Sequence, residues 1–264
     1  MWPRGFPLDS ISDDESHTYT ICNLSEPVIK QGLVSGDPDL DAIFRLTRKH
    51  ASKNIDISYD DKAKPVTLPK GVFTPYNSQN TMVTYPAFWS LVLPITVSMR
   101  VTDIWRSYWA QRLIWLFGGS LTYYPGTTRQ IRNAHSYLKD AQEEIDLYTK
   151  ASDFVSFLSS WSCSHDDFLR CTMQLTKDTA DKGFWGERDV VLIQTFLQDL
   201  VAVGYKFPAM SPDAPLCKGK QLRGLTCYPL EQPTTSNVVP ELAHTALKQR
   251  KPLCAELLQE FQDI

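Results

Sequence analysis

Two charged residues far apart in the sequence could act on an anionic, hydroxyl-rich ligand. Arg4 stays charged and presents a fork of hydrogen-bond donors that suits a diphosphate, and the adjacent Gly5 lets the backbone come close. Asp103 opens a helical segment whose dipole favours an ionised carboxylate, which could act as a general base on an acceptor hydroxyl. Each has an ordinary alternative, a surface arginine in a Pro-rich turn and an aspartate that caps a helix.

A short amide-rich loop and a pair of tryptophans add candidate binding groups. Asn77, Gln79 and Asn80 place several amide donors and acceptors within four residues, which suits hydroxyl-rich ligands and is also ordinary turn chemistry. Trp105 and Trp109 lie four residues apart on the helical segment, so one of them could form a wall for a stacked sugar. The amphipathic pattern around them favours core packing instead.

The acidic run from Asp37 to Asp41 could be mistaken for a metal site. Read as a calcium loop, it has Ala42 where Gly is required and Arg48 where the final glutamate belongs. Read as a D-x-D metal–nucleotide motif, it competes with a simpler role, with Asp37 as N-cap and Pro38 at the first helical position. We assign no metal site to this sequence, and its five histidines fall in no ligand spacing.

The elements that must position these residues fall into an α/β part followed by a helical part. Strands are predicted at 27–34, 54–59, 66–73, 95–99 and 120–124, and helices at 38–49 and 101–117. Further helices are predicted at 134–148 and at 154–161. A capping box formed by Ser164 and Asp167 predicts a third helix after it, and a fourth is predicted from 187 to a C-cap at Gly204. We therefore predict three domains: a partial α/β domain at 1–128, a helical extension at 129–206, and, at 207–264, a Pro-rich irregular arm with a helix at 241–261.

Composition excludes several classes of protein. The 264 residues carry a formal net charge of -3 and no basic stripe, so nucleic acid is not an expected partner. The most apolar stretch, residues 85–99, contains Pro86 and Pro94 and falls short of the roughly 20 residues of a membrane helix. The start of the chain has no apolar core of a secretory signal, so a complete protein of this sequence would be cytoplasmic.

The six cysteines form neither a C-x-x-C pair nor a Cys/His quartet, which argues against structural zinc. Six buried or free thiols are the simplest interpretation. In a secretory lumen, a disulfide between Cys217 and Cys227 would be the alternative.

Several motifs together resemble a known family of sugar-handling proteins. The runs WPRGFP at 2–7, LPKG at 68–71, NSQNT at 77–81 and MRVTDIW at 99–105 resemble, in the same order, the later motifs of the reversibly glycosylated polypeptides, or UDP-arabinopyranose mutases. The sequence to about residue 208 is more similar to the STELLO family of Golgi glycosyltransferase-like proteins. The phrases GLVSGDPDLDAIFRLTR, NSQNTMVTYPAFW, DIWRSYWAQRL and FLQDLVAVGYK carry this similarity.

This resemblance implies the C-terminal portion of an A-type glycosyltransferase fold that uses a nucleotide-sugar donor in Golgi polysaccharide or glycoconjugate synthesis, and in plant members an association with cellulose synthesis. In a complete homologue, D-x-D carboxylates would hold Mn²⁺ or Mg²⁺ on the diphosphate, and this chain is expected to begin after that half. By the same resemblance, Arg4 is a candidate for the residue that becomes sugar-linked. Asp103 is the candidate catalytic residue, and Arg4, Gly5, Asn77, Gln79, Asn80 and Trp105 are the candidate substrate-binding residues.

Two functions therefore stay open. The first is a glycosyltransferase domain, incomplete in this chain, located in the Golgi lumen if the chain belongs to a longer anchored protein. The second is a non-catalytic assembly or binding subunit for another glycosyltransferase. Under the first hypothesis, Arg4, Asn77 and Asp103 should come together around one cleft.

Overall fold

The computed structural model describes residues 2–11, 19–48, 55–134 and 136–225, which fall into two units. Residues 1–11 and 24–216 form the first unit, which holds a four-stranded sheet and the helices. Residues 12–23 and 217–264 form the second. Strands β1 (Tyr19–Leu24) and β6 (Cys217–Leu225) pair as a two-stranded sheet, so the arm predicted to be irregular contains a strand. The predicted helix at 241–261 and the residue Cys227 lie outside the described residues.

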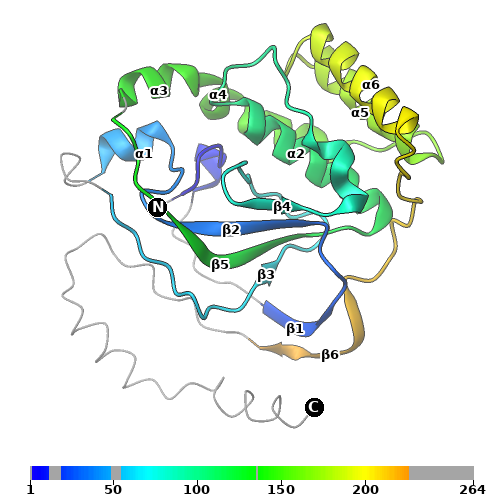
Figure 1. Ribbon diagram of the computed structural model, residues 1–264, viewed down its shortest axis with the longest axis horizontal. Helices are drawn as coiled ribbons and strands as arrows, with labels where there is room; N and C mark the ends of the chain where they lie inside the picture. The colour runs from blue at the N-terminus through cyan, green and yellow to red at the C-terminus, as the bar shows by residue number, and fades with distance from the viewer. Residues whose placement is uncertain (1, 12–18, 49–54, 135, 226–264) are drawn as a thin grey trace. The chain divides into compact units, whose positions relative to one another are not determined.

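The four-stranded sheet is mixed, with the order β3-β5-β2-β4 (Figure 1). Its two central strands, β2 (Ile29–Gly36) and β5 (Leu121–Gln130), are parallel, so the chain between them must cross back over the sheet. The short edge strands β3 (Val66–Thr67) and β4 (Thr81–Val83) run antiparallel to β5 and β2. The predicted α/β class is confirmed, whereas an A-type glycosyltransferase fold stays a prediction.

Three of the predicted strands differ from the structure, and the strand predicted at 66–73 is reduced to the two residues of β3. Residues 54–59 contribute, in their described part, a single bridge between Gly36 and Ile57. The predicted strand at 95–99 is wrong, since these residues form a bend and turn. The backbone N–H groups of Ile95 and Thr96 donate to the carboxylate of Asp189 at 2.6 and 3.2 Å, which removes the donors that a strand ladder would need.

Helix α1 (Ala42–Thr47) begins four residues later than the acidic run predicts. The N-cap is Asp41, whose Oδ1 accepts from the N–H of Phe44 at 2.6 Å, so the prediction of Asp37 as the cap is wrong. Asp37 instead lies 2.7 Å from the guanidinium of Arg45, in an ion pair. Asp37 therefore serves as the counter-ion of the buried Arg45 and not as a helix cap.

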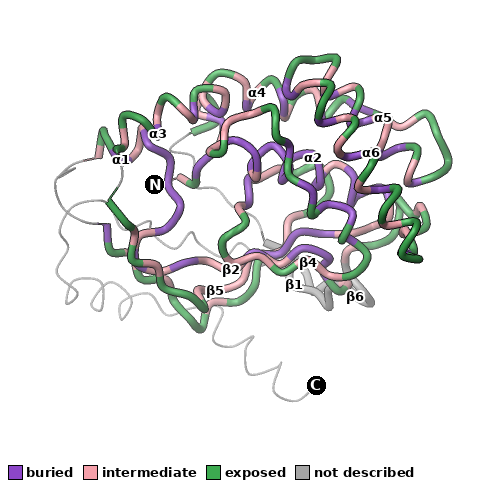
Figure 2. Tube along the Cα trace, turned by 45° about the horizontal axis from the view of Figure 1, so that its top comes forward, coloured by how far each residue is buried: buried purple, intermediate pink, exposed green. Residues whose placement is uncertain are grey.

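Helix α2 (Thr102–Ile114) lies at the centre of the first unit and is buried on nearly every side (Figure 2). The amphipathic interpretation of this helix is wrong, because its polar residues are buried and hydrogen-bonded rather than exposed. The side chain of Gln111, for example, both donates to and accepts from the backbone of Thr74, at 2.6 and 3.1 Å. Helix η3 (Trp115–Phe117) continues α2 to Gly118, where φ is +72°.

The remaining helices lie with α2 on one side of the sheet (Figures 1 and 2). They are the 3-10 helices η1 (Leu8–Ser10) and η2 (Tyr85–Leu91), and α3 (Tyr137–Glu143), α4 (Ile145–Ser160), α5 (Phe168–Asp181) and α6 (Glu187–Ala202). Helices are confirmed in this part of the chain, but the division predicted between residues 148 and 154 is wrong, since α3 ends at Glu143 and α4 runs without a break from Ile145 to Ser160. Asp167 alone caps α5, through the N–H of Arg170, without Ser164. Phe154 of α4 packs against Trp105 of α2 at 5.1 Å between ring centroids, so the core is continuous across the predicted boundary at residue 128.

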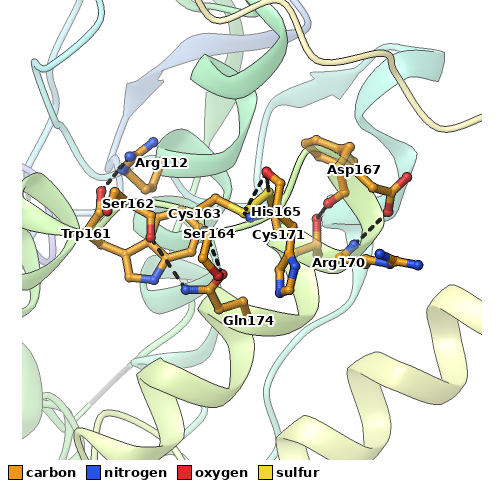
Figure 3. Close-up of a disulfide and its surroundings, with 12 residues drawn as sticks. Arg112, Trp161, Ser162, Cys163, Ser164, His165, Asp167, Arg170, Cys171 and Gln174 are labelled. Atoms are coloured by element: carbon orange, nitrogen blue, oxygen red, sulfur yellow. Dashed lines mark hydrogen bonds between the residues drawn. A yellow bond between two sulfur atoms is a disulfide. The ribbon is translucent and has the colours of Figure 1, made fainter.

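A disulfide joins Cys163, in the connection that follows α4, to Cys171 of α5 (Figure 3). The prediction of six free or buried thiols is therefore wrong. Around the disulfide, the guanidinium of Arg112 donates to the carbonyl of Trp161 at 2.6 Å, and Gln174 accepts from the N–H of Ser164 at 3.0 Å. Among the helices that the structure describes, none has the length and apolar character needed to span a membrane.

Candidate functional site

The start of the chain lies along the acidic segment 37–41. Pro3 forms an isolated antiparallel bridge with Leu40, and the N–H of Arg4 donates to the carbonyl of Asp39 at 3.3 Å. The indole of Trp2 donates to the carboxylate of Asp41. These contacts fix the turn in which Arg4 lies.

The guanidinium of Arg4 is buried between two aspartates. Its Nε and Nη2 donate to Asp39 at 2.9 and 2.7 Å, Nη2 also approaches both oxygens of Asp103 at 3.1 and 3.2 Å, and Nη1 donates to the carbonyl of Arg100. Burial alone would lower the pKa of Arg4, but Asp39 and Asp103 raise it above its ordinary value. Arg4 thus neutralises two carboxylates, and four of its five N–H donors are already used by groups of the protein. Whether it becomes sugar-linked stays a prediction, one that would require this buried side chain to leave its partners.

Gly5 serves the packing of α2 rather than the approach of a ligand. Its φ is +85°, and a Cβ there would lie 2.3 Å from Cγ2 of Ile104. Its carbonyl accepts from the hydroxyl of Tyr108 at 2.8 Å. The predicted contact of Gly5 with a substrate is therefore replaced by contact with a helix.

Asp103 lies in the first turn of α2, as predicted. Besides Arg4, its Oδ2 accepts from the backbone N–H of Ser78 at 3.2 Å, which ties the amide-rich loop to the helix. The side chain is 13% exposed, so a little solvent access remains. The structure gives Asp103 a positioning role, and its action as a general base stays a prediction.

The amide-rich loop is held from both sides by hydrogen bonds. Oδ1 of Asn77 accepts from the N–H of Gln79 at 3.0 Å, and the side chain of Gln79 donates to that of Gln130. The side chain of Asn80 donates to the carbonyl of Leu33 at 3.2 Å. It lies so close to β2 that a Cβ on Gly32 would approach it to 2.3 Å. Asn80 thus lies at the register shift between β2 and β5, where Gly32 pairs with Tyr124 and Val34 pairs with Thr128, so that the extra residues belong to β5.

A pocket of about 180 Å³ lies beside this loop. Its lining is drawn from the start of the chain, strand β2, the acidic segment and the amide-rich loop: Trp2, Pro3, Gln31, Gly32, Leu33, Val34, Pro38, Asp39, Leu40, Tyr59, Thr74, Pro75, Tyr76, Asn77, Gln79 and Tyr123. Of the predicted site residues, Asn77 and Gln79 line it. Arg4, Asn77 and Asp103 do belong to segments that come together, as predicted, but Arg4 and Asp103 pair with each other and do not line the pocket.

Trp105 does not take part in the pocket. Its side chain is fully buried, and its indole N–H donates to the carbonyl of Phe184 at 2.9 Å. Core packing is therefore its role, and the prediction that it binds substrate is wrong for this arrangement.

Most of the pocket lining is not among the predicted site residues, and two such residues are Asp39 and Tyr76. Burial alone would raise the pKa of Asp39, but the guanidinium of Arg4, helped by Arg100 and Arg132, holds that pKa below its ordinary value. The sequence predicts Asp39 as part of a helix start, and its spacing from Asp37 and Asp41 is the one local signal for it. Tyr76 directly precedes the amide-rich loop, which was the available signal.

The carboxylates of the acidic run do not converge on one point. Asp37 pairs with Arg45, Asp39 with Arg4, and Asp41 caps α1. Across the part of the chain that the structure describes, no group of three or more His, Cys, Asp or Glu side chains could hold a metal ion. The described residues do not fit the divalent metal of a complete homologue, so we derive no step through one.

Comparison with known proteins agrees with the sequence resemblance. Residues 100–215 match the family model described as STELLO glycosyltransferases. "Probable glycosyltransferase STELLO1" of Arabidopsis thaliana is 37% identical over 211 residues, which cover 80% of this chain, and "Probable glycosyltransferase STELLO2" of the same plant is 36% identical over the same length. The chain belongs to the STELLO family.

The match covers only part of each STELLO relative. The aligned residues cover 27% of each of the two curated relatives. The family model spans α2 to α6, which includes Asp103 and the disulfide, whereas Arg4 and Asn77 precede it. Family membership therefore suggests a glycosyltransferase, and the donor, the acceptor and the cellular compartment are matters for proposal.

Proposed function

We propose that the chain is part of a glycosyltransferase that uses a nucleotide-sugar donor to build a polysaccharide or glycoconjugate. STELLO membership supports this class of activity. The observation that carries the proposal is the pocket, where amide side chains and aromatic rings stand together with a carboxylate. Amides and carboxylates hydrogen-bond hydroxyls, and aromatic rings cover the apolar faces of sugars.

We further propose that the protein works in the Golgi lumen. The disulfide between Cys163 and Cys171 supports a lumenal over a cytoplasmic location, because disulfides persist in oxidising compartments and are rare in the reducing cytosol.

The test uses the native protein, immunopurified from its own cells, with a panel of UDP- and GDP-sugars, Mg²⁺ or Mn²⁺, and oligosaccharide acceptors. Release of the nucleoside diphosphate is measured with and without acceptor. We expect acceptor-dependent release from at least one donor. If Asp103 is the general base, Asp103→Asn should lower the rate by about 10²–10⁴-fold.

The matched control is Asp56→Asn, which removes a carboxylate from an exposed pair with Arg129 and should leave the rate unchanged. Absence of release from every donor would contradict the enzymatic proposal. An equal rate in Asp103→Asn and the control would contradict only the role of Asp103.

A second function, assembly with another glycosyltransferase, is favoured by an exposed apolar segment between residues 85 and 99. Its exposed side chains are Tyr85, Phe88, Leu91, Leu93, Ile95 and Met99. Where exposed apolar side chains gather on a protein surface, they mark interaction sites. Leu91→Asp should then reduce the native mass of the complex, whereas Leu138→Asp, a control at an exposed leucine on α3, should not. Equal native masses for both variants would contradict assembly through this segment.

A further inference from the structure

Strand β1 runs into the sequence Asn23-Leu24-Ser25, which has the Asn-x-Ser/Thr pattern of an N-glycosylation acceptor. The chain has six asparagines, and Asn23 is the only one followed two residues later by serine or threonine. The middle residue is leucine rather than proline. A proline there would hold the asparagine in an extended conformation, which keeps the serine hydroxyl from turning back toward the amide. Asn23 is therefore the single candidate acceptor in this sequence.

The connection that follows this pattern lies at the surface. Ser25 is partly exposed, the side chain of Glu26 is 74% exposed, and the chain becomes buried from Pro27 onward. A glycan is bulky and hydrophilic, so its acceptor must lie where the folded chain meets solvent. The pattern falls where the chain leaves β1 for such an exposed connection.

The hydrogen-bond partners of this segment come late in the chain. The N–H of Ser25 donates to the carbonyl of Leu216 at 2.9 Å, and its hydroxyl donates to the carbonyl of Pro215 at 3.1 Å. Strand β1 likewise pairs with β6, which begins at Cys217.

This separation leaves time for a modification before folding. Pro215 follows Ser25 by 190 residues, so at roughly 5–20 residues per second about 10–40 s of synthesis pass before it exists. During that interval the serine hydroxyl has not yet met Pro215, and β1 has not yet met β6. The Asn-x-Ser segment is then accessible to a transferase that acts on an unfolded chain.

The disulfide gives an independent observation about the compartment. The bond between Cys163 and Cys171 is of a kind that persists in an oxidising lumen and is rare in the reducing cytosol. Transfer of an oligosaccharide to Asn-x-Ser takes place on the lumenal side of the secretory system. The disulfide and the acceptor pattern, in different parts of the chain, therefore agree on the same side of the membrane.

We propose that Asn23 is N-glycosylated. This inference rests on the proposed lumenal location, and it goes beyond the proposed transfer activity. In the reaction, Nδ2 of Asn23 forms a bond to C1 of the first sugar of an oligosaccharide carried on a lipid diphosphate. The bond from C1 to the diphosphate oxygen breaks, the lipid diphosphate leaves with the electron pair, and the amide nitrogen gives one proton to a base of the transferase.

The test uses the full-length protein, immunopurified from its own cells, and examines the peptide that contains Asn23 by mass spectrometry. We expect this peptide to carry a glycan, and peptide N-glycosidase A to release the glycan and convert Asn23 to aspartate. Asn23→Gln should abolish the modification. Ser25→Ala should abolish it as well, although the asparagine is still present, and Ser25→Thr should retain it because the hydroxyl is restored.

The matched control is Asn133→Gln, which replaces an exposed asparagine that is followed by Ala134 and His135 and so lies outside any acceptor pattern. It should leave the glycan on Asn23 unchanged. The readout is a covalent change in one peptide, so it depends neither on the stability of each variant nor on whether the protein transfers sugar.

An unmodified Asn23 in the native protein would overturn the inference, as would equal modification in Ser25→Ala and Ser25→Thr. Alkylation of free thiols in the same sample separates this failure from that of the wider proposal. Alkylated Cys163 and Cys171 beside an unmodified Asn23 would refute the lumenal location too, whereas an intact disulfide would leave that location standing. A glycan on Asn23 of a protein that releases nucleotide from no donor would refute the enzymatic proposal and support this inference.

Discussion

Replacing Arg4 with methionine tests whether the buried clamp organises the site. The substitution leaves Asp39, whose side chain is 5% exposed, without its closest cation. Removing one partner of a buried ion pair costs about 3–5 kcal/mol. Arg132 and Arg100 still face Asp39, at 3.6 and 4.0 Å, so we expect a loss near the lower end, about 3 kcal/mol of unfolding free energy.

The assay is urea unfolding followed by tryptophan fluorescence, which reports on the first unit because Trp89, Trp105 and Trp109 are buried there. The control is Arg129→Met. Its pair with Asp56 is exposed, 56% and 65%, and such pairs contribute about 0–1 kcal/mol. Equal losses in the two variants would refute the reasoning that the Arg4 clamp is a buried, stabilising pair.

The same variant has a predicted pH dependence. The pKa of Asp39 in the folded protein lies below its ordinary value of about 3.9. Its contribution to stability is therefore fully present above about pH 4 and is lost as the pH falls through the depressed pKa. The difference in stability between the wild type and Arg4→Met should narrow as the pH falls below 4. A difference that widens there would mean that Asp39 is not the group concerned.

Two further substitutions test packing and cross-linking. Gly5→Ala should lower the unfolding free energy by roughly 2–4 kcal/mol, through positive φ and a clash with Ile104; Gly71→Ala has a similar φ, +92°, but open space, so calorimetry should show a smaller loss. An equal loss in both would contradict the clash. Cys163→Ser with Cys171→Ser should cost roughly 2–3 kcal/mol by opening the eight-residue loop, and a reductant should have the same effect on the wild type; no change in urea midpoint in either would contradict a structural disulfide.

Helices were easier to predict from this sequence than the sheet. Regular apolar spacing marked α4 and α6, and Gly204 ends α6 in the left-handed region, as expected. The sequence predicts a strand over 66–73, of which only the two residues of β3 pair in the sheet, and β4, with three residues, is too short for alternation to mark it. Residues 95–99 have an apolar composition suited to a strand, but their N–H groups bond to Asp189, more than 90 residues away. A partner so distant leaves no local signal.

The candidate site was predictable in its segments and not in its roles. The sequence motifs selected the turn at Arg4, the loop at Asn77 and the start of α2, and hydrogen bonds join all three. The role of each of these side chains depends on the partners that it meets in the folded protein, and those partners come from distant parts of the sequence. Arg4 was assigned to a diphosphate because an arginine fork suits one, and a carboxylate suits the same fork equally well.

The pairing of Arg4 also constrains how a donor could bind. For Arg4 to contact a diphosphate, it would have to leave two aspartates, of which Asp39 would stay buried. A cost of about 3 kcal/mol lowers affinity by more than a hundredfold. A donor would bind more favourably to cations that are not already paired, and the pocket offers none among its lining residues. Contact of a diphosphate with Arg4 is therefore disfavoured, because the clamp with Asp39 and Asp103 would have to open first.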